Sequence, residues 1–227
     1  NMFDVAVRHD ALKVNLARNT KPVKIERKPV KALRPEQVQA ILRLFWGATV
    51  EQGKDIYDEV ALLAVTGSRT GEFLSLEWAE IDLDRKDDKA VARITGTLVP
   101  DAKTGQLKKQ QEGKSLAATR GLTLPPTVTL RLRERYRCSE GELVFPSRNG
   151  TFQWPNNFRR RWRAVLDGTD FEGTTPRDFR KAVATFLDRK VGREGARDQL
   201  GHESEDVTTA YYIEQEERVA DFADHLE

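Results

Sequence analysis

The chain has 227 residues, of which 38% are hydrophobic and 33% charged, and its formal net charge is +2. This composition supplies enough apolar material for one large buried core and excludes an intrinsically disordered chain. The single cysteine, Cys138, which we expect to be a buried or idle thiol, excludes an intrachain disulfide, and no apolar run approaches the ~20 residues of a membrane span, so we expect a soluble, intracellular protein.

Hydrophobic periodicity predicts several helices in the first half of the chain. The first opens at Pro35 and carries a stripe of Val38, Ile41, Leu42 and Phe45, and the second carries Ile56, Val60, Leu63 and Ala64. Thr66-Gly67 ends the second helix in a turn, and a third resumes near Thr70 with Phe73, Leu74 and Leu76 buried and Trp78 near its end. Arg69 therefore lies at a helix–turn–helix junction.

Strand patterns follow, and then helical patterns return. Residues 89–97 and 122–124 alternate as strands do, with a long basic connection over 101–119 between them. A helix is favoured up to Arg137, and another from about Pro155 packs Phe158, Trp162 and Val165. The last predicted helix, 176–189, buries Phe179, Val183, Phe186 and Leu187. Arg180 follows Phe179 directly, so an arginine this near a core face needs a partner.

Charge is distributed unevenly along the chain. Residues 103–137 contain nine Lys and Arg against two Glu, and residues 144–163 contain five arginines and no acid. Residues 203–227 carry nine Asp and Glu against one arginine. The basic middle is typical of a surface that follows a phosphate backbone, although solvated charge alone would look the same.

Two arginine motifs and a histidine precede a pair of tyrosines. They read Thr66-Gly67-Ser68-Arg69-Thr70-Gly71-Glu72, Arg177-Asp178-Phe179-Arg180, Leu200-Gly201-His202 and Tyr211-Tyr212. A free phenol has a pKa near ~10, so it attacks at neutral pH only if its proton is taken and its charge is matched. Planar guanidinium groups fit the oxygens of a phosphodiester, so these residues could attack, neutralise and release one.

The set resembles the tyrosine recombinases of the phage-integrase family, from about Ala32 to Tyr212. That family has an arginine in T-G-x-R-x-G-E, a lysine on a β-turn, an H-x-x-R, L-G-H and a C-terminal tyrosine. The resemblance implies a mainly α fold with a small antiparallel β-sheet, placed at 32–212. Residues 1–31 would end a truncated core-binding domain and its linker. Residues 213–227 would form an acidic tail that is exchanged between protomers or folds back on its own basic surface.

The resemblance also implies the roles of the site residues. Tyr212 attacks a DNA phosphate and forms a 3′-phosphotyrosine, while Arg69, Arg177 and Arg180 hold that phosphate, His202 assists and Lys114 protonates the leaving 5′ oxygen. Lys114-Ser115 has the family spacing ahead of the strand that ends in Leu124-Pro125, whereas Lys103-Thr104 has the same step at the wrong distance.

Two positions depart from the pattern or leave a choice open. Arg177 stands where the family usually has a histidine, and arginine can donate to a phosphate but cannot exchange a proton. Adjacent helical side chains diverge by about 100°, so only one tyrosine of the pair can point into the site. The local V-T-x-x-aromatic-Tyr pattern favours Tyr212, with Tyr211 as its packing partner and as the alternative nucleophile.

Further basic residues are candidates for DNA contact. Lys103, Lys108 and Lys109 are either backbone-binding neighbours of Lys114 or plain solvated charges, and the helix from Pro155 leaves three arginines to reach phosphate, namely Arg159, Arg160 and Arg163.

No cofactor is expected, because the sequence has neither a carboxylate cluster for metal nor a G-x-x-x-x-G-K-[ST] loop. The expected partners are double-stranded DNA, three further protomers on synapsed sites, and accessory DNA-bending or directionality proteins; the free protein would be a monomer. Two rival functions remain: a type IB topoisomerase-like enzyme that relaxes supercoils, and a DNA-binding module that has lost catalysis.

Overall fold

The computed structural model describes residues 2–20, 30–85, 88–111, 119–201 and 212–213. The N-terminal part forms helix α1 (Met2–Arg8) and a 3-10 turn, η1 (Leu16–Asn19). Asn15 donates a hydrogen bond to Asp4 at 2.7 Å, and Arg18 pairs with the same carboxylate at 3.1 Å. These contacts tie α1 to η1.

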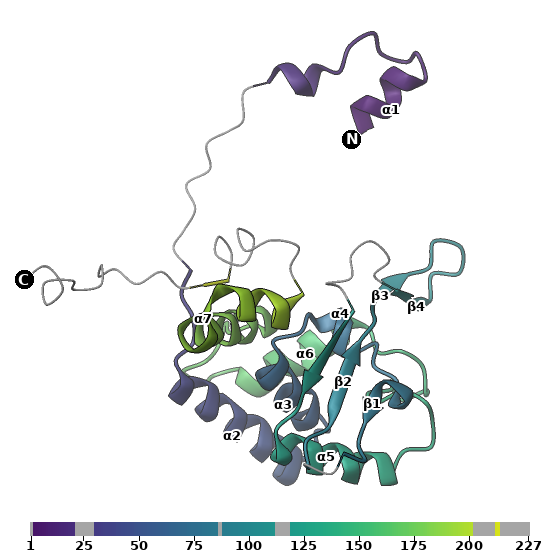
Figure 1. Cartoon of the computed structure of the whole chain (residues 1–227). Coiled ribbons are helices and arrows are strands. Elements are labelled where there is room, and N and C mark those ends of the chain that lie inside the picture. Colours follow the sequence, from purple (N-terminus) through teal and green to yellow (C-terminus); the bar gives the residue numbers. More distant parts are fainter. Residues whose placement is uncertain (1, 21–29, 86–87, 112–118, 202–211, 214–227) are drawn as a thin grey trace, which may run out of the picture.

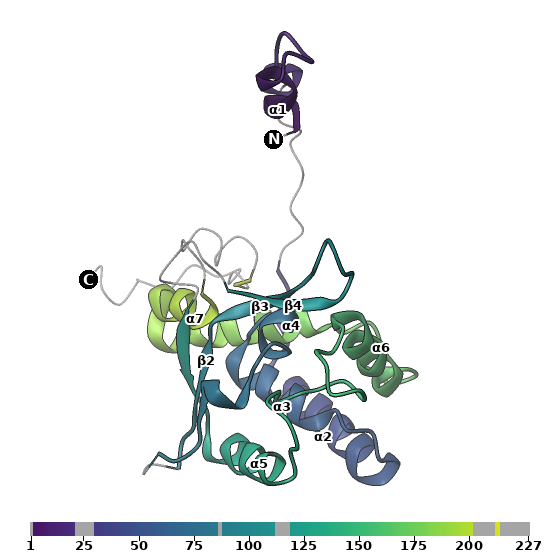
Figure 2. The same ribbon diagram turned by 90° about the vertical axis from the view of Figure 1, so that its right-hand side faces the viewer.

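Five longer helices build the body of the protein (Figures 1 and 2). They are α2 (Pro35–Gln52), α3 (Tyr57–Thr66), α5 (Pro126–Arg137), α6 (Pro155–Leu166) and α7 (Pro176–Leu200). Four of them, all except α3, begin on a proline, whose fixed φ suits the first helical position and whose missing N–H is not needed there. The helices predicted from Pro35, from about residues 56 and 155, and from 176 are present, and the segment up to Arg137, for which a helix was favoured, is helical from Pro126.

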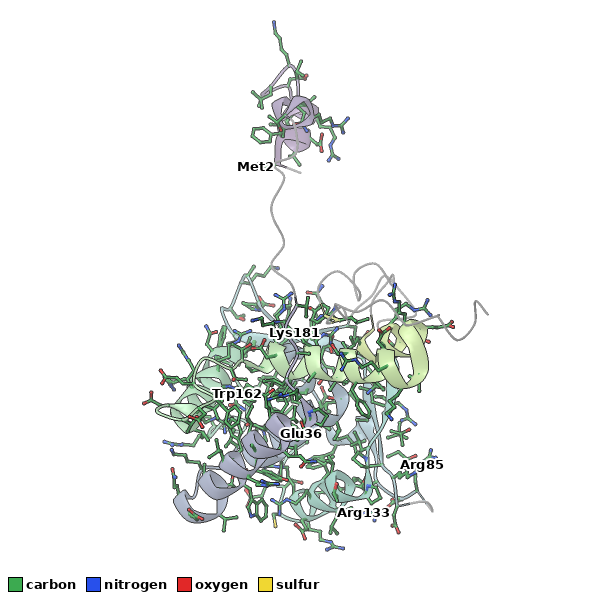
Figure 3. All side chains as sticks on the ribbon, turned by 90° about the vertical axis from the view of Figure 1, so that its left-hand side faces the viewer. Met2, Glu36, Arg85, Arg133, Trp162 and Lys181 are labelled. Carbon is green, nitrogen blue, oxygen red and sulfur yellow. The ribbon has the colours of Figure 1, made fainter. Side chains whose placement is uncertain are left out.

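The helices enclose the main hydrophobic core, which has aromatic residues at its centre, and a second, smaller cluster joins Ala184, Leu200 and Ile213. The ring of Trp162, labelled in Figure 3, lies 4.7 Å from that of Phe45 and 5.2 Å from that of Phe179, measured between centroids. The Trp162 indole donates a 2.7 Å hydrogen bond to the carbonyl of Thr174, so its polar atom is satisfied in the interior. The core thereby joins α2, α6 and α7, and it holds α7 in a fixed position.

Two small antiparallel sheets complete the fold. Strands β1 (Ile81–Asp82), β2 (Val91–Ile94) and β5 (Arg120–Thr123) form a sheet in the order β1-β2-β5. Strands β3 (Gly96–Pro100) and β4 (Leu107–Gln111) form a separate hairpin, with Gly96 opposite Gln111. A short helix α4 (Thr70–Phe73) and a 3-10 turn η2 (Trp78–Glu80) lead into the strands.

Several expectations for these elements were wrong in detail. The strand expected over 89–97 is divided between two sheets, and the basic connection over 101–119 contains β4. Helix α4 ends at Phe73, and α7 continues past residue 189 to Leu200, with a kink at Gly192, where φ is 80°. Phe186 was expected in the core but is 51% exposed, although it lies two turns from the buried Phe179 on the same stripe of the helix. Cys138, expected to be a buried or idle thiol, is exposed, so the first of these two alternatives is wrong.

Candidate active site

The site begins at the turn that ends α3. Gly67 adopts a left-handed conformation with φ 62°, and its N–H donates to the carbonyl of Leu63 at 2.9 Å. A Cβ at this position would lie 3.0 Å from Cγ1 of Val183 and 3.1 Å from Cδ2 of Leu200. Only glycine fits, since α7 packs directly against the turn. The close approach brings the first arginine motif beside the second.

Arg69 is held by its own motif. Its backbone N–H donates to Glu72 Oε2 at 2.9 Å, and its Nη1 contacts Glu72 Oε1 at 2.5 Å. The Glu72 side chain is fully buried, whereas 42% of the Arg69 side chain remains exposed. The carboxylate therefore fixes the guanidinium at the start of α4 and leaves part of it open to a ligand.

Arg180 is the buried arginine of the site. Only 2% of the residue is exposed, and its Nη1 and Nη2 donate 2.8 Å hydrogen bonds to the carbonyls of Gly67 and Leu200. Burial lowers the pKa of Arg180 to about 10; the charge of Glu72 opposes this shift, and the charge of Arg69 adds to it. The guanidinium remains cationic at neutral pH, and it ties the turn after α3 to the end of α7. The expectation that Arg180 needs a partner is confirmed.

Tyr212 lies against two arginines of α7. The centroid of its ring is 5.3 Å from the guanidinium carbon of Arg177 and 5.1 Å from that of Arg180. Thr185 Oγ1 donates to the Tyr212 carbonyl at 3.4 Å, and the neighbouring Ile213 is buried. Cations within about 6 Å of an aromatic ring are attracted by its negative face. The structure thus brings Arg177, Arg180 and Tyr212 into contact, and Arg69 lies close enough to Arg180 for its charge to lower the pKa of Arg180.

Arg177 occupies the first turn of α7. Thr175 precedes the helix, and its backbone N–H and hydroxyl bind one oxygen of Asp178 at 2.9 and 2.6 Å. This cap fixes the helix start. The carboxylate of Asp178 that makes this cap also forms a salt bridge with Lys181 at 2.8 Å. Asp178 therefore points to Thr175 and Lys181, and Arg177 faces Tyr212.

Sequence reasoning missed Arg120, which belongs to the same cluster. Its Nη2 lies 2.7 Å from Glu72 Oε2, its Nε donates to the carbonyl of Gln199 at 2.8 Å, and 7% of its side chain is exposed. Burial alone would raise the pKa of Glu72, but the charges of Arg120, Arg69 and Arg180 lower it below its ordinary value. Glu72 therefore stays ionised at neutral pH.

The candidate DNA-contacting residues lie on two elements. Lys103 is exposed in the β3–β4 turn, Lys108 pairs with Asp101 at 2.9 Å, and Lys109 is mostly buried against Glu80 at 2.5 Å. Arg159, Arg160 and Arg163 are exposed on α6, while Phe158 and Trp162 of that helix are buried, as expected. Lys114, His202 and Tyr211 lie outside the described residues.

The basic stretch 103–137 does not form one continuous phosphate track, which corrects the expectation from charge alone. Helix α5, which forms the C-terminal part of this stretch, lies at the end of the domain opposite α7 and the β3–β4 hairpin (Figures 1 and 2). The structure describes eight of the nine Lys and Arg residues in this stretch. Six of them form salt bridges: Lys108, Lys109, Arg120, Arg131, Arg133 and Arg135.

Among the described residues, no group of three or more His, Cys, Asp or Glu side chains could hold a metal ion. No helix within the described ranges is both long and apolar enough to cross a membrane.

Comparison with known proteins gives the family. The family model described as "Phage integrase family" matches residues 31–218, which is most of the chain, so this protein belongs to the phage integrase family. The ICEBs1 integrase of Bacillus subtilis (strain 168) is 34% identical over 82 residues, a match that covers 36% of this chain and 21% of that protein. The matched region is thus about a fifth of the length of this relative.

Solved structures share the fold. The integrase of the Tn1549 transposon, in complex with a circular intermediate DNA, aligns with a TM-score of 0.71 and 18% identity, covering 99% of this chain and 74% of that one. XerA recombinase aligns with a TM-score of 0.61 and 18% identity over 98% of this chain and 73% of that one. A lambda integrase tetramer bound to a Holliday junction aligns at 0.58 and 18%, over 96% and 58%. The mainly α fold with small antiparallel sheets is therefore the fold of tyrosine recombinase catalytic domains.

Proposed function

We propose that this chain is the catalytic part of a site-specific DNA recombinase, or integrase, that cleaves and rejoins DNA through a 3′-phosphotyrosine. The contact of the Tyr212 ring with Arg177 and Arg180 carries the proposal most directly. Permanent cations beside a phenol stabilise the phenolate that attack requires. The same guanidinium groups can bind the non-bridging oxygens of the phosphate under attack.

The proposed cleavage step uses these residues together with His202 and Lys114, which lie outside the described residues. The Tyr212 oxygen forms a bond to phosphorus, the bond from phosphorus to the 5′ oxygen breaks, and the phenolic proton passes to His202. Lys114 gives a proton to the departing 5′ oxygen, which leaves as a hydroxyl group. Arg69, Arg177 and Arg180 neutralise the charge that gathers on the phosphate oxygens.

Rejoining reverses each step. A 5′ hydroxyl attacks the phosphotyrosine, a bond from phosphorus to oxygen forms, and the bond to Tyr212 breaks. One phosphate ester replaces another at every stage, so this exchange requires neither ATP nor a metal ion. Strand exchange between two duplexes needs four such sites, and we therefore propose a tetramer on synapsed DNA in the cytoplasm, aided by DNA-bending or directionality proteins.

We propose that four basic residues bind the DNA backbone. They are Lys103 on the β3–β4 hairpin and Arg159, Arg160 and Arg163 on α6. They are exposed, and α6 and the hairpin adjoin α4, where Arg69 begins the helix (Figure 2). Lys108 and Lys109 would join them only by exchanging their carboxylate partners for phosphate.

A covalent capture experiment tests the proposal. The protein is incubated with a pool of nicked duplexes that have randomised cores, so that cleavage releases a short strand and traps the intermediate. We expect a protein band shifted by covalent DNA, with the linked peptide identified by mass spectrometry. Tyr212→Phe should abolish the band and Tyr211→Phe should retain it. Tyr136→Phe, at an exposed tyrosine of α5, is the matched control and should also retain it.

Other outcomes would favour the rivals. Linkage to Tyr211 would move the nucleophile by one residue. Relaxation of supercoiled plasmids of any sequence by the monomer would favour a topoisomerase-like enzyme. Specific DNA complexes without any covalent product, unchanged in Tyr212→Phe, would show a module that binds and does not cleave.

A further inference from the structure

Arg120 links two parts of the site that are far apart in the sequence. It begins β5, where it pairs in register with Ile94 of β2, so its backbone position is set by the sheet. Its guanidinium reaches Glu72 of α4 on one side and the Gln199 carbonyl of α7 on the other, at 2.7 and 2.8 Å. One side chain thus joins β5, α4 and the last turn of α7.

The contact with Glu72 acts on Arg69. Oxygen Oε2 of Glu72 accepts from both Arg120 Nη2 and the backbone N–H of Arg69, while Oε1 contacts the Arg69 guanidinium. A fully buried carboxylate requires compensating charge, because burial strongly disfavours an isolated ion. Arg120 is nearly as buried as Glu72, whereas Arg69 is partly exposed. Arg120 therefore supplies an internal counter-charge, and Arg69 can turn its exposed part toward a ligand.

The contact with Gln199 acts on the end of α7. The last carbonyls of a helix have no partner within the helix and must be satisfied from outside. Here Arg120 binds the carbonyl of Gln199 and Arg180 binds that of Leu200, each at 2.8 Å. The side-chain amide of Gln199 donates a hydrogen bond to the carbonyl of Thr66 at 3.3 Å. The helix end is thereby fixed against the turn that carries the first arginine motif.

We propose that Arg120 is a positioning residue. It holds the Arg69 guanidinium, through Glu72, and the C-terminal end of α7 in fixed positions relative to each other, and it does not itself bind phosphate. Its low exposure and its two charge-assisted contacts leave it facing the protein and not the solvent. The inference rests on the proposed recombinase function for its effect on catalysis, but its structural part can be tested without DNA.

The test compares Arg120→Gln with Arg133→Gln. Arg133 is a matched control, since it also joins one carboxylate, Asp88 at 3.0 Å, to one carbonyl, that of Leu83 at 2.8 Å. It lies at the end of the domain opposite Lys181 of α7 (Figure 3). Both variants lose a carboxylate partner and a carbonyl partner; the partner of Arg133, Asp88, is mostly exposed, and only Arg120→Gln loses its partners beside the site.

Two readouts are expected to change in Arg120→Gln alone. In the absence of DNA, amide hydrogen exchange in peptides covering 69–72 and 198–201 should rise by on the order of 10-fold, because charge-assisted hydrogen bonds are lost. With saturating nicked DNA, covalent-complex formation should slow by on the order of 10- to 100-fold, as misplaced catalytic groups do, with an unchanged Kd for DNA. Arg120→Lys should recover part of the rate.

The pH profile adds a readout that a loss of stability would not produce. The pKa of Glu72 is lowered in the folded protein by arginine charges, of which Arg120 is the strongest, against the opposing effect of burial. Removing Arg120 lets burial raise that pKa, so Glu72 becomes protonated at a higher pH as the solution is acidified. In a plot of cleavage rate against pH, the fall in rate on the acid side should therefore occur at a higher pH in Arg120→Gln than in the wild type. In Arg133→Gln it should occur at the same pH as in the wild type.

The outcomes separate this inference from the proposed function. Equal exchange at 69–72 and 198–201 in Arg120→Gln and the wild type would overturn the positioning role, and so would a rate loss explained wholly by weaker DNA binding. A wild-type protein that forms no covalent complex would refute the recombinase proposal, while the exchange result would still decide whether Arg120 holds the two segments together.

Discussion

Replacing Gly67 by alanine tests how closely the two arginine motifs are packed. Gly67 has φ 62°, and a Cβ there would lie 3.0 Å from Cγ1 of Val183 and 3.1 Å from Cδ2 of Leu200. A left-handed conformation costs a non-glycine residue about 1–2 kcal/mol, and an added methyl group in a packed interior costs about 1–3 kcal/mol more. We therefore expect Gly67→Ala to lower the free energy of unfolding by about 2–5 kcal/mol.

Gly53 provides a matched control within the same fold. It also ends a helix in the left-handed conformation, with φ 65°, but a Cβ there meets nothing within 4 Å. Gly53→Ala should therefore show only the conformational cost of about 1–2 kcal/mol. The difference between the two variants measures the contact of the turn with α7.

Urea unfolding is the assay, with the midpoint and the slope fitted for each variant. An unchanged slope would show that the compactness of the folded and unfolded states is the same, so that the midpoints report stability. Because the carbonyl of Gly67 accepts from Arg180, Gly67→Ala should also slow covalent capture of DNA, and Gly53→Ala should not. Equal stability losses in the two variants would refute the argument that close packing against α7 requires glycine at position 67.

Two further predictions concern α7. Arg177→His should make covalent-complex formation depend on a group that titrates near ~6.5, whereas the wild type lacks that dependence at this position; a pH series on both proteins measures it, and identical profiles would show that residue 177 does not act on the phosphate. Phe179→Ala should reduce the free energy of unfolding by about 3–5 kcal/mol because the side chain is fully buried, while Phe186→Ala, at a half-exposed site, should change it by about 1 kcal/mol or less. Urea unfolding compares the two, and similar losses would contradict the assignment of the buried face.

Helix α6 was predictable because it bears a strong apolar period, and four of the five longer helices begin on proline, whereas the apolar period of α7 is weak and its part beyond residue 189 was not predicted. The β3–β4 hairpin was not predictable, because β4 reads Leu-Lys-Lys-Gln-Gln, with no alternation of apolar residues to mark a strand. Its pairing with β3 depends on backbone contacts that sequence does not display. Phe186 was misplaced because the helical period puts it on the same face as Phe179, whereas burial also depends on whether the fold brings neighbours to cover that face two turns further along α7.

The site was predictable where residues belong to motifs, and not where they act through others. The rings and guanidinium groups of Tyr212, Arg177 and Arg180 lie in contact, with Arg69 beside Arg180, while their catalytic roles stay predictions. Arg120 lacked any local signal, since a single arginine in a short strand reveals its role only when the fold brings Glu72 and Gln199 to it.

The salt bridges of α5 have a consequence for how the protein would respond to ionic strength. Each lysine or arginine that neutralises a DNA phosphate releases condensed counterions, and the logarithm of the association constant falls with the logarithm of salt by ~0.9 per phosphate. Arg131 and Arg135 are engaged with acids of the α3 region, Asp58 and Asp55, on the far end of the domain. In the proposed complex these two arginines neutralise no phosphate and release no counterions. A dependence of the association constant on salt that is calculated from all the Lys and Arg residues in the sequence would therefore be too steep.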